Sequence, residues 1–248
     1  MKVVFSEAFY PCYVEDAAAV EGRMESIVGV IHDKVDFIEA EPATEEDILA
    51  VHDKEQLDRV KRKGLYEISA LAAGGAIQTA KIGLTEPAFG LLRPPGHHAS
   101  QFMSWGYCYF NNMAIALTRL KKDGLIRTGF VLDIDLHYGD GTVHILGDKD
   151  WVSIHNPVSR TREGYLDDVA NTLKEFHADI LGISAGFDNH QRDWGGLLET
   201  EDYKTIGTMV RDTCTRAGAA YFAILEGGYR KKVLGYNVEA LLDGMEII

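Results

Sequence analysis

Short apolar runs alternate with longer amphipathic segments along most of the chain. The apolar runs are rich in β-branched and aromatic residues, which is typical of buried strands. They predict strands at residues 2–5, 88–92, 130–136, 151–154, 179–184 and 221–225. Apolar positions at helical spacing predict helices at residues 17–32, 44–63, 66–82, 112–122, 165–177 and 200–216.

Two helix starts and a fold class follow from this pattern. Thr44 with Asp47 is close to a capping box, and Thr200 with Tyr203 marks a second predicted N-cap. Strands that alternate with helices indicate an α/β fold, with a mainly parallel sheet covered on both faces in three αβα layers. Neither a linker nor an internal repeat interrupts the pattern, so we expect one domain over residues 1–248.

Polar residues stand at the ends of four predicted strands, where ligands bind on such a sheet. They form the segments RPPGHH at 93–98, DIDLH at 133–137, AGFD at 185–188 and EGGY at 226–229. Side chains alternate along a strand, so we expect Asp133, Asp135 and His137 on one face. Ionised carboxylates in a sheet buried on both faces need a cation or a dense set of donors. A hydrogen-bonded cluster without metal is the alternative.

Asp188 stands at a third strand end and could complete an Asp, His, Asp ligand set with Asp135 and His137. Three protein ligands with an open fourth position are the arrangement of a catalytic zinc, which makes a bound water acidic enough to attack. The same nitrogen and oxygen donors also suit Fe(II) or Co(II). Taken alone, Asp188 could instead cap a helix.

His97 and His98 follow a rigid Pro-Pro-Gly segment, which fixes the approach of the two imidazoles. Asp133 and Asp140 could each accept a proton from one ring, so that one ring acts as a base on the metal-bound water. Tyr229, after two glycines, could donate its hydroxyl to a developing oxyanion. The alternatives are a tandem histidine on a surface loop and a tyrosine that only packs.

Composition narrows the class of partner. The formal net charge of −13, from 38 acidic and 25 basic residues, argues against nucleic acid; it either favours cationic ligands weakly or only keeps the protein soluble. Cys12, Cys108 and Cys214 are widely spaced and predict reduced thiols. Without an apolar run of about 18 residues or a recognisable secretory leader, we expect a soluble cytoplasmic protein with no membrane partner.

Taken together, these segments resemble the histone deacetylase and acetylpolyamine amidohydrolase family, from about Thr44 to Tyr229. The resemblance rests on RPPGHHA at 93–99, GYCYFNN at 106–112, DIDLHYGDGT at 133–142, SAGFD at 184–188 and EGGY at 226–229. It implies the arginase-deacetylase fold and a zinc-dependent deacetylase that hydrolyses an N-acyl amide of a lysine side chain, a small amine or a polyamine. The alternative is a non-catalytic protein that binds acylated amines, but such a protein would be expected to lose a ligand or Tyr229, and none is lost.

The resemblance assigns roles to the residues already singled out. It implies a zinc ligand set of Asp135, His137 and Asp188. It implies that proton transfer and oxyanion stabilisation depend on His97, His98, Asp133, Asp140 and Tyr229. Within this second set His98 is the general base and acid, His97 is its electrostatic partner, and Tyr229 polarises the carbonyl.

Three further sites are implied by the resemblance. They are a wall of the acyl-lysine tunnel at Gly106 and Tyr107, an inner acetate cavity at Arg23, and a structural potassium site at Asp133 and Ser153. Where the family has a longer loop with a second tunnel aromatic, Pro157 leads almost at once into a helix. One tunnel wall is therefore expected to be missing, and the substrate stays open between a small acetylated amine, such as an acetylpolyamine, and acetyl-lysine on a protein.

The related dinuclear manganese site of the arginase type does not fit this chain. It needs an Asp at each of two positions that hold Gly139 and His190 here. We therefore expect one metal ion. A nucleotide-binding domain is also disfavoured, because its glycine-rich strand-to-helix fingerprint is not found. The oligomeric state is left open.

Overall fold

Seven strands form one sheet in the computed structural model, which describes residues 1–246. All neighbouring strands pair in parallel, in the order β2-β1-β3-β7-β6-β4-β5. The strands are β1 (Lys2–Phe5), β2 (Asp36–Glu39), β3 (Ala88–Gly90), β4 (Gly129–Asp133), β5 (Val152–His155), β6 (Ile180–Ala185) and β7 (Ala220–Leu225). The inner strands β3, β4 and β6 are fully buried, which explains their continuous apolar sequences.

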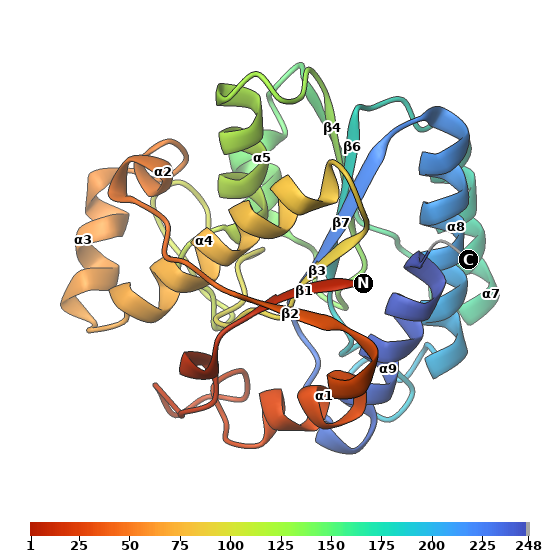
Figure 1. Ribbon diagram of the computed structural model, residues 1–248, viewed down its shortest axis with the longest axis horizontal. Coiled ribbons are helices and arrows are strands. Elements are labelled where there is room, and N and C mark those ends of the chain that lie inside the picture. Colours follow the sequence, from red (N-terminus) through yellow and green to blue (C-terminus); the bar gives the residue numbers. More distant parts are fainter. Residues whose placement is uncertain (247–248) are drawn as a thin grey trace.

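Helices cover both faces of this sheet (Figure 1). One layer holds α2 (Glu45–Leu49), α3 (Lys54–Arg62), α4 (Tyr66–Gly83) and α5 (Asn112–Lys122). The opposite layer holds α1 (Arg23–Ile31), α7 (Arg162–Lys174), α8 (Thr200–Ala217) and α9 (Lys231–Met245), while α6 (Asp140–Leu146) contacts α5 and β5. Two short 3-10 helices lie at Glu7–Phe9 and His32–Lys34. The predicted three-layer αβα fold with a parallel sheet is confirmed.

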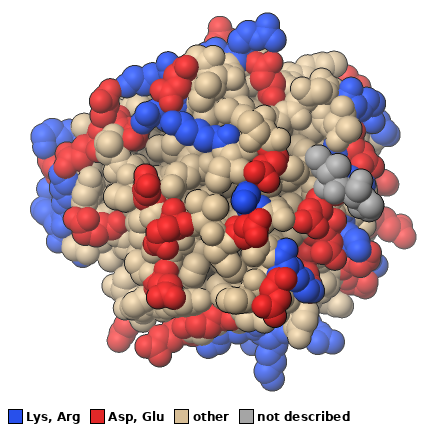
Figure 2. Space-filling model, viewed as in Figure 1, with Lys and Arg blue, Asp and Glu red and all other residues tan. Residues whose placement is uncertain are grey.

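The molecular surface is of mixed charge. Figure 2 shows acidic and basic side chains interspersed over one face, without a large region of a single sign. Among residues 1–246, no helix combines the length and the apolar character that crossing a bilayer requires.

Several element boundaries differ from the sequence prediction. The predicted helix at 44–63 is two helices, because Asp53 accepts a hydrogen bond from the backbone N–H of Gln56 and starts α3 anew. The capping box of Thr44 and Asp47 is confirmed. The predicted cap at Thr200 is wrong by one residue, since Glu199 is the N-cap of α8. One strand and two α-helices were not predicted, namely β2, α6 and α9, and neither was the 3-10 helix at Glu7–Phe9.

The predicted strand at 130–136 ends early, at Asp133, because side-chain acceptors replace the backbone ladder there. Oδ1 of Asp133 accepts from the backbone N–H of Asp135 at 3.2 Å, and Oδ1 of Asp135 accepts from that of His137 at 2.9 Å. The alternation argument is therefore wrong beyond Asp133. Asp133 ends the strand, and a loop brings Asp135 and His137 to the edge of the sheet.

Candidate active site

Three side chains converge beyond the carboxyl ends of β4 and β6. Nδ1 of His137 lies 3.1 Å from Oδ1 of Asp135 and 3.0 Å from Oδ2 of Asp188. Both carboxylates are buried, and Oδ2 of Asp188 has no hydrogen-bond partner in the described part of the chain. One donor atom from each residue lies within 4.8 Å of the others. The structure thus brings the three predicted ligands together at a spacing that one ion could bridge.

Two glycines keep the space between these carboxylates open. A Cβ on Gly227 would lie 2.5 Å from Oδ2 of Asp135 and 2.8 Å from Oδ2 of Asp188, and one on Gly186 would overlap Asp135. The backbone N–H of Gly227 also donates to Oδ2 of Asp135 at 2.8 Å. An unpartnered buried carboxylate oxygen, one imidazole and a glycine-lined space fit a divalent cation.

The protonation of this group reflects its excess of carboxylates. Burial and the charge of Asp135 raise the pKa of Asp188 to about 6. The hydrogen bond to Asp135 and the nearby carboxylate of Asp188 raise the pKa of His137 to about 10. Without a cation the carboxylates therefore keep a proton on His137, and metal binding should release it.

Substitution of Gly227 by alanine should weaken metal binding without unfolding the protein. The added Cβ crowds both carboxylates, and we expect the affinity for Zn²⁺ to fall about 10- to 100-fold, as measured by competition with a chelating indicator. Gly29→Ala is the matched control, because no atom lies within 4 Å of its added Cβ. Equal zinc affinity in the two variants would show that the ion does not sit between the carboxylates.

His97 and His98 lie side by side, with 4.0 Å between their ring centroids, but in different surroundings. Nδ1 of His97 lies 3.0 Å from Asp133. Burial of His97 opposes its protonation, but the negative charges of Asp135 and Asp133 have the larger effect and raise the pKa of His97 well above its usual value. Nδ1 of His98 lies 2.6 Å from Asp140, while burial and the charge of His97 lower the pKa of His98 to about 4. One ring is therefore charged and its neighbour neutral.

Tyr229 projects from the turn after β7 into a cavity of about 260 Å³. Gly228 adopts a φ of 114°, which this turn requires, and Asp193 accepts hydrogen bonds from the backbone N–H groups of Tyr229 and Arg230 at 2.7 and 2.8 Å. Burial raises the pKa of the phenol, so the hydroxyl remains a donor. The cavity is lined by Pro95, His97, His98, Trp105, Gly106, Tyr107, His137, Trp194, Gly227 and Tyr229.

Two tryptophans that the sequence reasoning did not single out form walls of this cavity. The indole of Trp105 stacks on His98 at 3.8 Å between centroids, and its Nε1 donates to Asp140 at 2.9 Å. The indole of Trp194 stacks on Tyr229 at 4.1 Å. Trp194 thus supplies a wall of this cavity from the loop after Asp188, and the missing wall expected after Asn156 stays a prediction. The sequence contains one signal for each tryptophan, which is its place close to a motif: Trp105 directly precedes the GYCYFNN segment, and Trp194 follows the SAGFD segment.

Gly106 and Tyr107 lie at the cavity as predicted. A Cβ on Gly106, whose φ is 57°, would overlap the ring of His98, so only glycine fits there. Tyr107 has a φ of 67°, a strained conformation for a residue with a side chain, and its ring lies 5.9 Å from that of Tyr229. Strain of this kind is common at binding sites.

Arg23 is fully buried behind the turn that carries Tyr229. Its Nε and Nη2 donate to the carbonyl oxygens of Gly228 and Glu226 at 2.8 and 2.6 Å, and its guanidinium lies 5.6 Å from the Tyr229 ring centroid. Nη1 has no hydrogen-bond partner within residues 1–246. Arg23 therefore supports the turn that carries Tyr229, and its Nη1 is left as a donor without a partner among the described residues.

Ser153, predicted with Asp133 for a potassium site, is exposed on β5. It pairs with Phe130 in the register of the sheet, whereas Asp133 lies further along β4 and is buried. The structure shows no hydrogen bond between Ser153 and Asp133 within the described residues.

Glu226 is a further buried acid that the sequence reasoning left without a role. Its Oε2 accepts from the backbone N–H groups of Gly96 and His97 at 2.7 and 3.2 Å, and burial raises its pKa to about 7. It forms a second cluster of potential ligand atoms with His97 and Cys108. The carboxylate ties the histidine segment to the end of β7.

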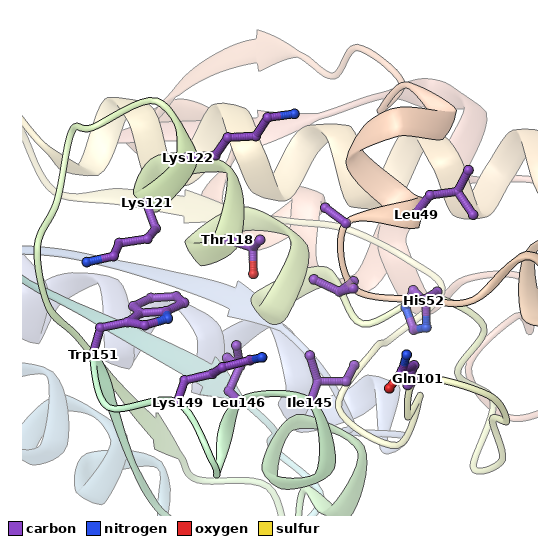
Figure 3. A pocket seen from close by; sticks show the side chains of 12 residues that line it. Leu49, His52, Gln101, Thr118, Lys121, Lys122, Ile145, Leu146, Lys149 and Trp151 are labelled. Carbon is purple, nitrogen blue, oxygen red and sulfur yellow. The ribbon is translucent and has the colours of Figure 1, made fainter.

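A larger hollow of about 450 Å³ lies elsewhere, between α2, α5 and α6 (Figure 3). Lysines border it, but Lys122 pairs with Glu46 and Lys121 donates to the carbonyl oxygen of Arg127 at 2.7 Å. Its only histidine, His52, is held through both ring nitrogens by backbone groups. No nucleophile, base and ligand set converges among its lining residues, so the cavity at Tyr229 is the better candidate.

The comparisons with known proteins agree with this geometry. The family model described as "Histone deacetylase domain" matches residues 14–161 and 159–245. The chain is 31% identical to a "Probable deacetylase" of Methanothermobacter thermautotrophicus, over 73% of this chain and 65% of that one. It is 31% identical to a "Probable deacetylase" of Archaeoglobus fulgidus, over 88% of this chain and 74% of that one. It is 29% identical to the "Acetylpolyamine amidohydrolase" of Mycoplana ramosa, over 73% and 64%.

A solved structure, of the "HDA15 HD domain", shares the fold. It superposes with a TM-score of 0.84 at 22% identity, over 99% of this chain and 90% of that one. The parallel sheet, the Asp135, His137 and Asp188 group at its carboxyl edge and the family match are consistent with one another. The chain belongs to the histone deacetylase family.

Proposed function

We propose that this chain is a zinc-dependent deacetylase that hydrolyses an N-acyl amide with a single metal ion. The observation that carries the proposal is the convergence of Asp135, His137 and Asp188 beside a neutral His98 and a protonated Tyr229 in one cavity. The names of the relatives, deacetylase and acetylpolyamine amidohydrolase, support hydrolysis of an amide.

Zinc held by the three ligands would polarise the substrate carbonyl and acidify an attacking water. His98 is placed to take the proton from that water, because Asp140 fixes its Nδ1 and no hydrogen bond within the described residues occupies its Nε2. The hydroxyl of Tyr229 donates a hydrogen bond to the carbonyl oxygen as negative charge develops there. His98 then returns the proton to the nitrogen as the C–N bond breaks, which yields an amine and a carboxylic acid that loses its remaining proton at neutral pH.

His97 and Asp133 complete this arrangement without exchanging protons with the substrate. The charge of His97, held by the carboxylates of Asp133 and Asp135, keeps a second proton off the neighbouring His98. His98 is thereby neutral and ready to accept a proton. The potassium site at Asp133 and Ser153 and the inner-cavity role of Arg23 remain predictions.

Trp105 is proposed as the residue that positions His98. Trp105→Phe keeps a ring stacked on His98 but removes the hydrogen bond to Asp140, so kcat should fall about tenfold with KM little changed. Trp105→Leu removes both contacts and should cost more. Phe102→Leu, at an exposed aromatic residue of the same loop, is the control. Full activity in Trp105→Leu would show that the indole has no such role.

The proposal is tested by metal analysis coupled to turnover. The zinc-loaded protein should hydrolyse members of a panel of acetylated amines, acetyl-lysine peptides and longer acyl amides. A non-catalytic protein would bind these compounds without releasing carboxylate. No hydrolysis with Zn²⁺, Fe²⁺ or Co²⁺ bound would overturn the proposed activity.

A further inference from the structure

A basic hollow adjoins the candidate active site. It measures about 440 Å³ and shares Tyr229 with the cavity described above. Four cationic residues border it, from a loop and from the start of α9: Arg192, Arg230, Lys231 and Lys232. We use the name basic hollow for the space bordered by these four residues and Tyr229.

None of the four cations forms an ion pair within residues 1–246. Arg230 donates through Nε to the carbonyl oxygen of Arg192 at 3.1 Å, and Lys231 donates to that of Glu21 at 3.0 Å. The nearby carboxylate of Asp193 accepts hydrogen bonds from two backbone N–H groups instead. The positive charge of the hollow is therefore not neutralised by these contacts.

This concentration of charge runs against the composition. The chain carries 38 acidic and 25 basic residues, so acidic partners for these cations are plentiful in the sequence. Like charges that share one hollow repel each other, which opposes folding slightly. The first turn of α9 holds no acidic residue of its own, and Asp193 from the other loop is the one carboxylate bonded to the backbone at its start. All four cations are exposed to solvent, and together they offer a ligand of opposite sign a place beside Tyr229.

The position of the hollow indicates which part of a ligand it would contact. Tyr229 borders both spaces, so a substrate whose acyl carbonyl lies at the Tyr229 hydroxyl has its departing amine directed past the aromatic walls, Trp105, Tyr107 and Trp194. Because Tyr229 is the residue that the two spaces share, we infer that the far end of that amine extends toward Arg230 and Lys232. A second ammonium group at that end would be repelled, and a carboxylate or phosphate would be attracted.

We propose that the preferred substrate is an acylated amine whose amine half carries an anionic group, a carboxylate or a phosphate, held in the basic hollow. This proposal rests on the proposed deacetylase function and narrows its substrate class. Hydrolysis breaks the amide C–N bond and leaves the anionic group unchanged. The chain as a whole carries a net charge of −13, but beside Tyr229 the four cations of the basic hollow make the local charge positive.

Three acetamides of similar length separate the possibilities. They are 6-acetamidohexanoate, which is anionic, N-pentylacetamide, which is neutral, and N-acetylcadaverine, which is cationic. At low ionic strength kcat/KM should rank in that order, with about tenfold between the anionic and the neutral compound and most of the difference in KM. The preference should shrink with added salt, since screening weakens contacts between exposed charges.

A double variant with a matched control tests the residues themselves. Arg230→Gln with Lys232→Gln should reduce the ratio of kcat/KM for the anionic and neutral compounds to near one. Lys121→Gln with Lys149→Gln removes the same charge from the other hollow (Figure 3) and should leave the ratio unchanged. A preference that persists in the first variant, or disappears equally in both, would overturn the assignment of the basic hollow.

The outcomes also separate this inference from the proposed function. Faster hydrolysis of the cationic or neutral compound by the wild-type protein would overturn the anion preference and leave the deacetylase intact. Hydrolysis of none of the three compounds would count against the proposed activity. The anion preference is then tested by calorimetric binding, and it is overturned if 6-acetamidohexanoate binds no more tightly than the neutral and cationic compounds. Inorganic phosphate should compete with the anionic compound; stimulation of N-pentylacetamide hydrolysis would instead assign the hollow to a separate ligand.

Discussion

Replacing Tyr229 with phenylalanine is expected to lower kcat about 10²- to 10³-fold while leaving the metal content unchanged. The phenol is the hydroxyl that the structure presents to the cavity from the turn after β7, and its raised pKa keeps the proton on the oxygen. Loss of one donor to a developing oxyanion typically costs about this much in kcat. The ring itself stays, so its stacking on Trp194 at 4.1 Å should be preserved.

Tyr107→Phe is the control for this experiment. Its ring lines the same cavity and lies 5.9 Å from that of Tyr229, but we assign it to the wall and give its hydroxyl no part in the reaction. Both variants should bind zinc and melt close to the wild-type temperature. Near-normal turnover in Tyr229→Phe, or an equal loss in both variants, would remove the phenol from the proposed mechanism.

Replacing Asp188 with asparagine is expected to abolish both zinc binding and hydrolysis. One of three ligands loses its charge, and its unpartnered Oδ2 is the atom that faces His137. We expect the zinc affinity to fall by more than about 100-fold, which metal analysis and chelator competition would measure. Asp168→Asn, at a half-buried carboxylate bonded to His155, is the control. Full zinc occupancy in Asp188→Asn would remove Asp188 from the ligand set.

The stability of the metal-free protein should change in the opposite direction. Burial and Asp135 raise the pKa of Asp188 to about 6 from its usual value of 3.8, so the ionised carboxylate opposes folding at neutral pH. Asp188→Asn removes that penalty, and the metal-free variant should melt at a higher temperature than metal-free wild type at pH 7. The difference should shrink as the pH falls through 6 and should vanish below 3.8, where the carboxyl is protonated in both states. A lower melting temperature at pH 7 would indicate misfolding rather than loss of a ligand.

The fold class and the group of polar residues at the sheet edge could be predicted from the sequence alone. Strands such as β4 and β6 can be recognised in the sequence as continuous apolar runs, because strands buried on both faces contain few polar residues. Asp133, Asp135, His137 and Asp188 stood out for the complementary reason that carboxylates at the ends of such runs need a partner. The half-exposed β2 escaped prediction, because its acidic ends and its edge position give it no continuous apolar run.

The residues that line the cavity and the charges beside it could be identified only from the folded structure. Trp105 and Trp194 belong to separate loops, and no local pattern tells that each stacks on a different polar side chain. The basic hollow likewise joins Arg192 to the segment at Arg230, which folding brings together. Residue types and their periodicity are local properties that a sequence displays directly. Which loops meet above the sheet depends on packing across the whole domain, and for that reason the floor of the site was predictable and its mouth was not.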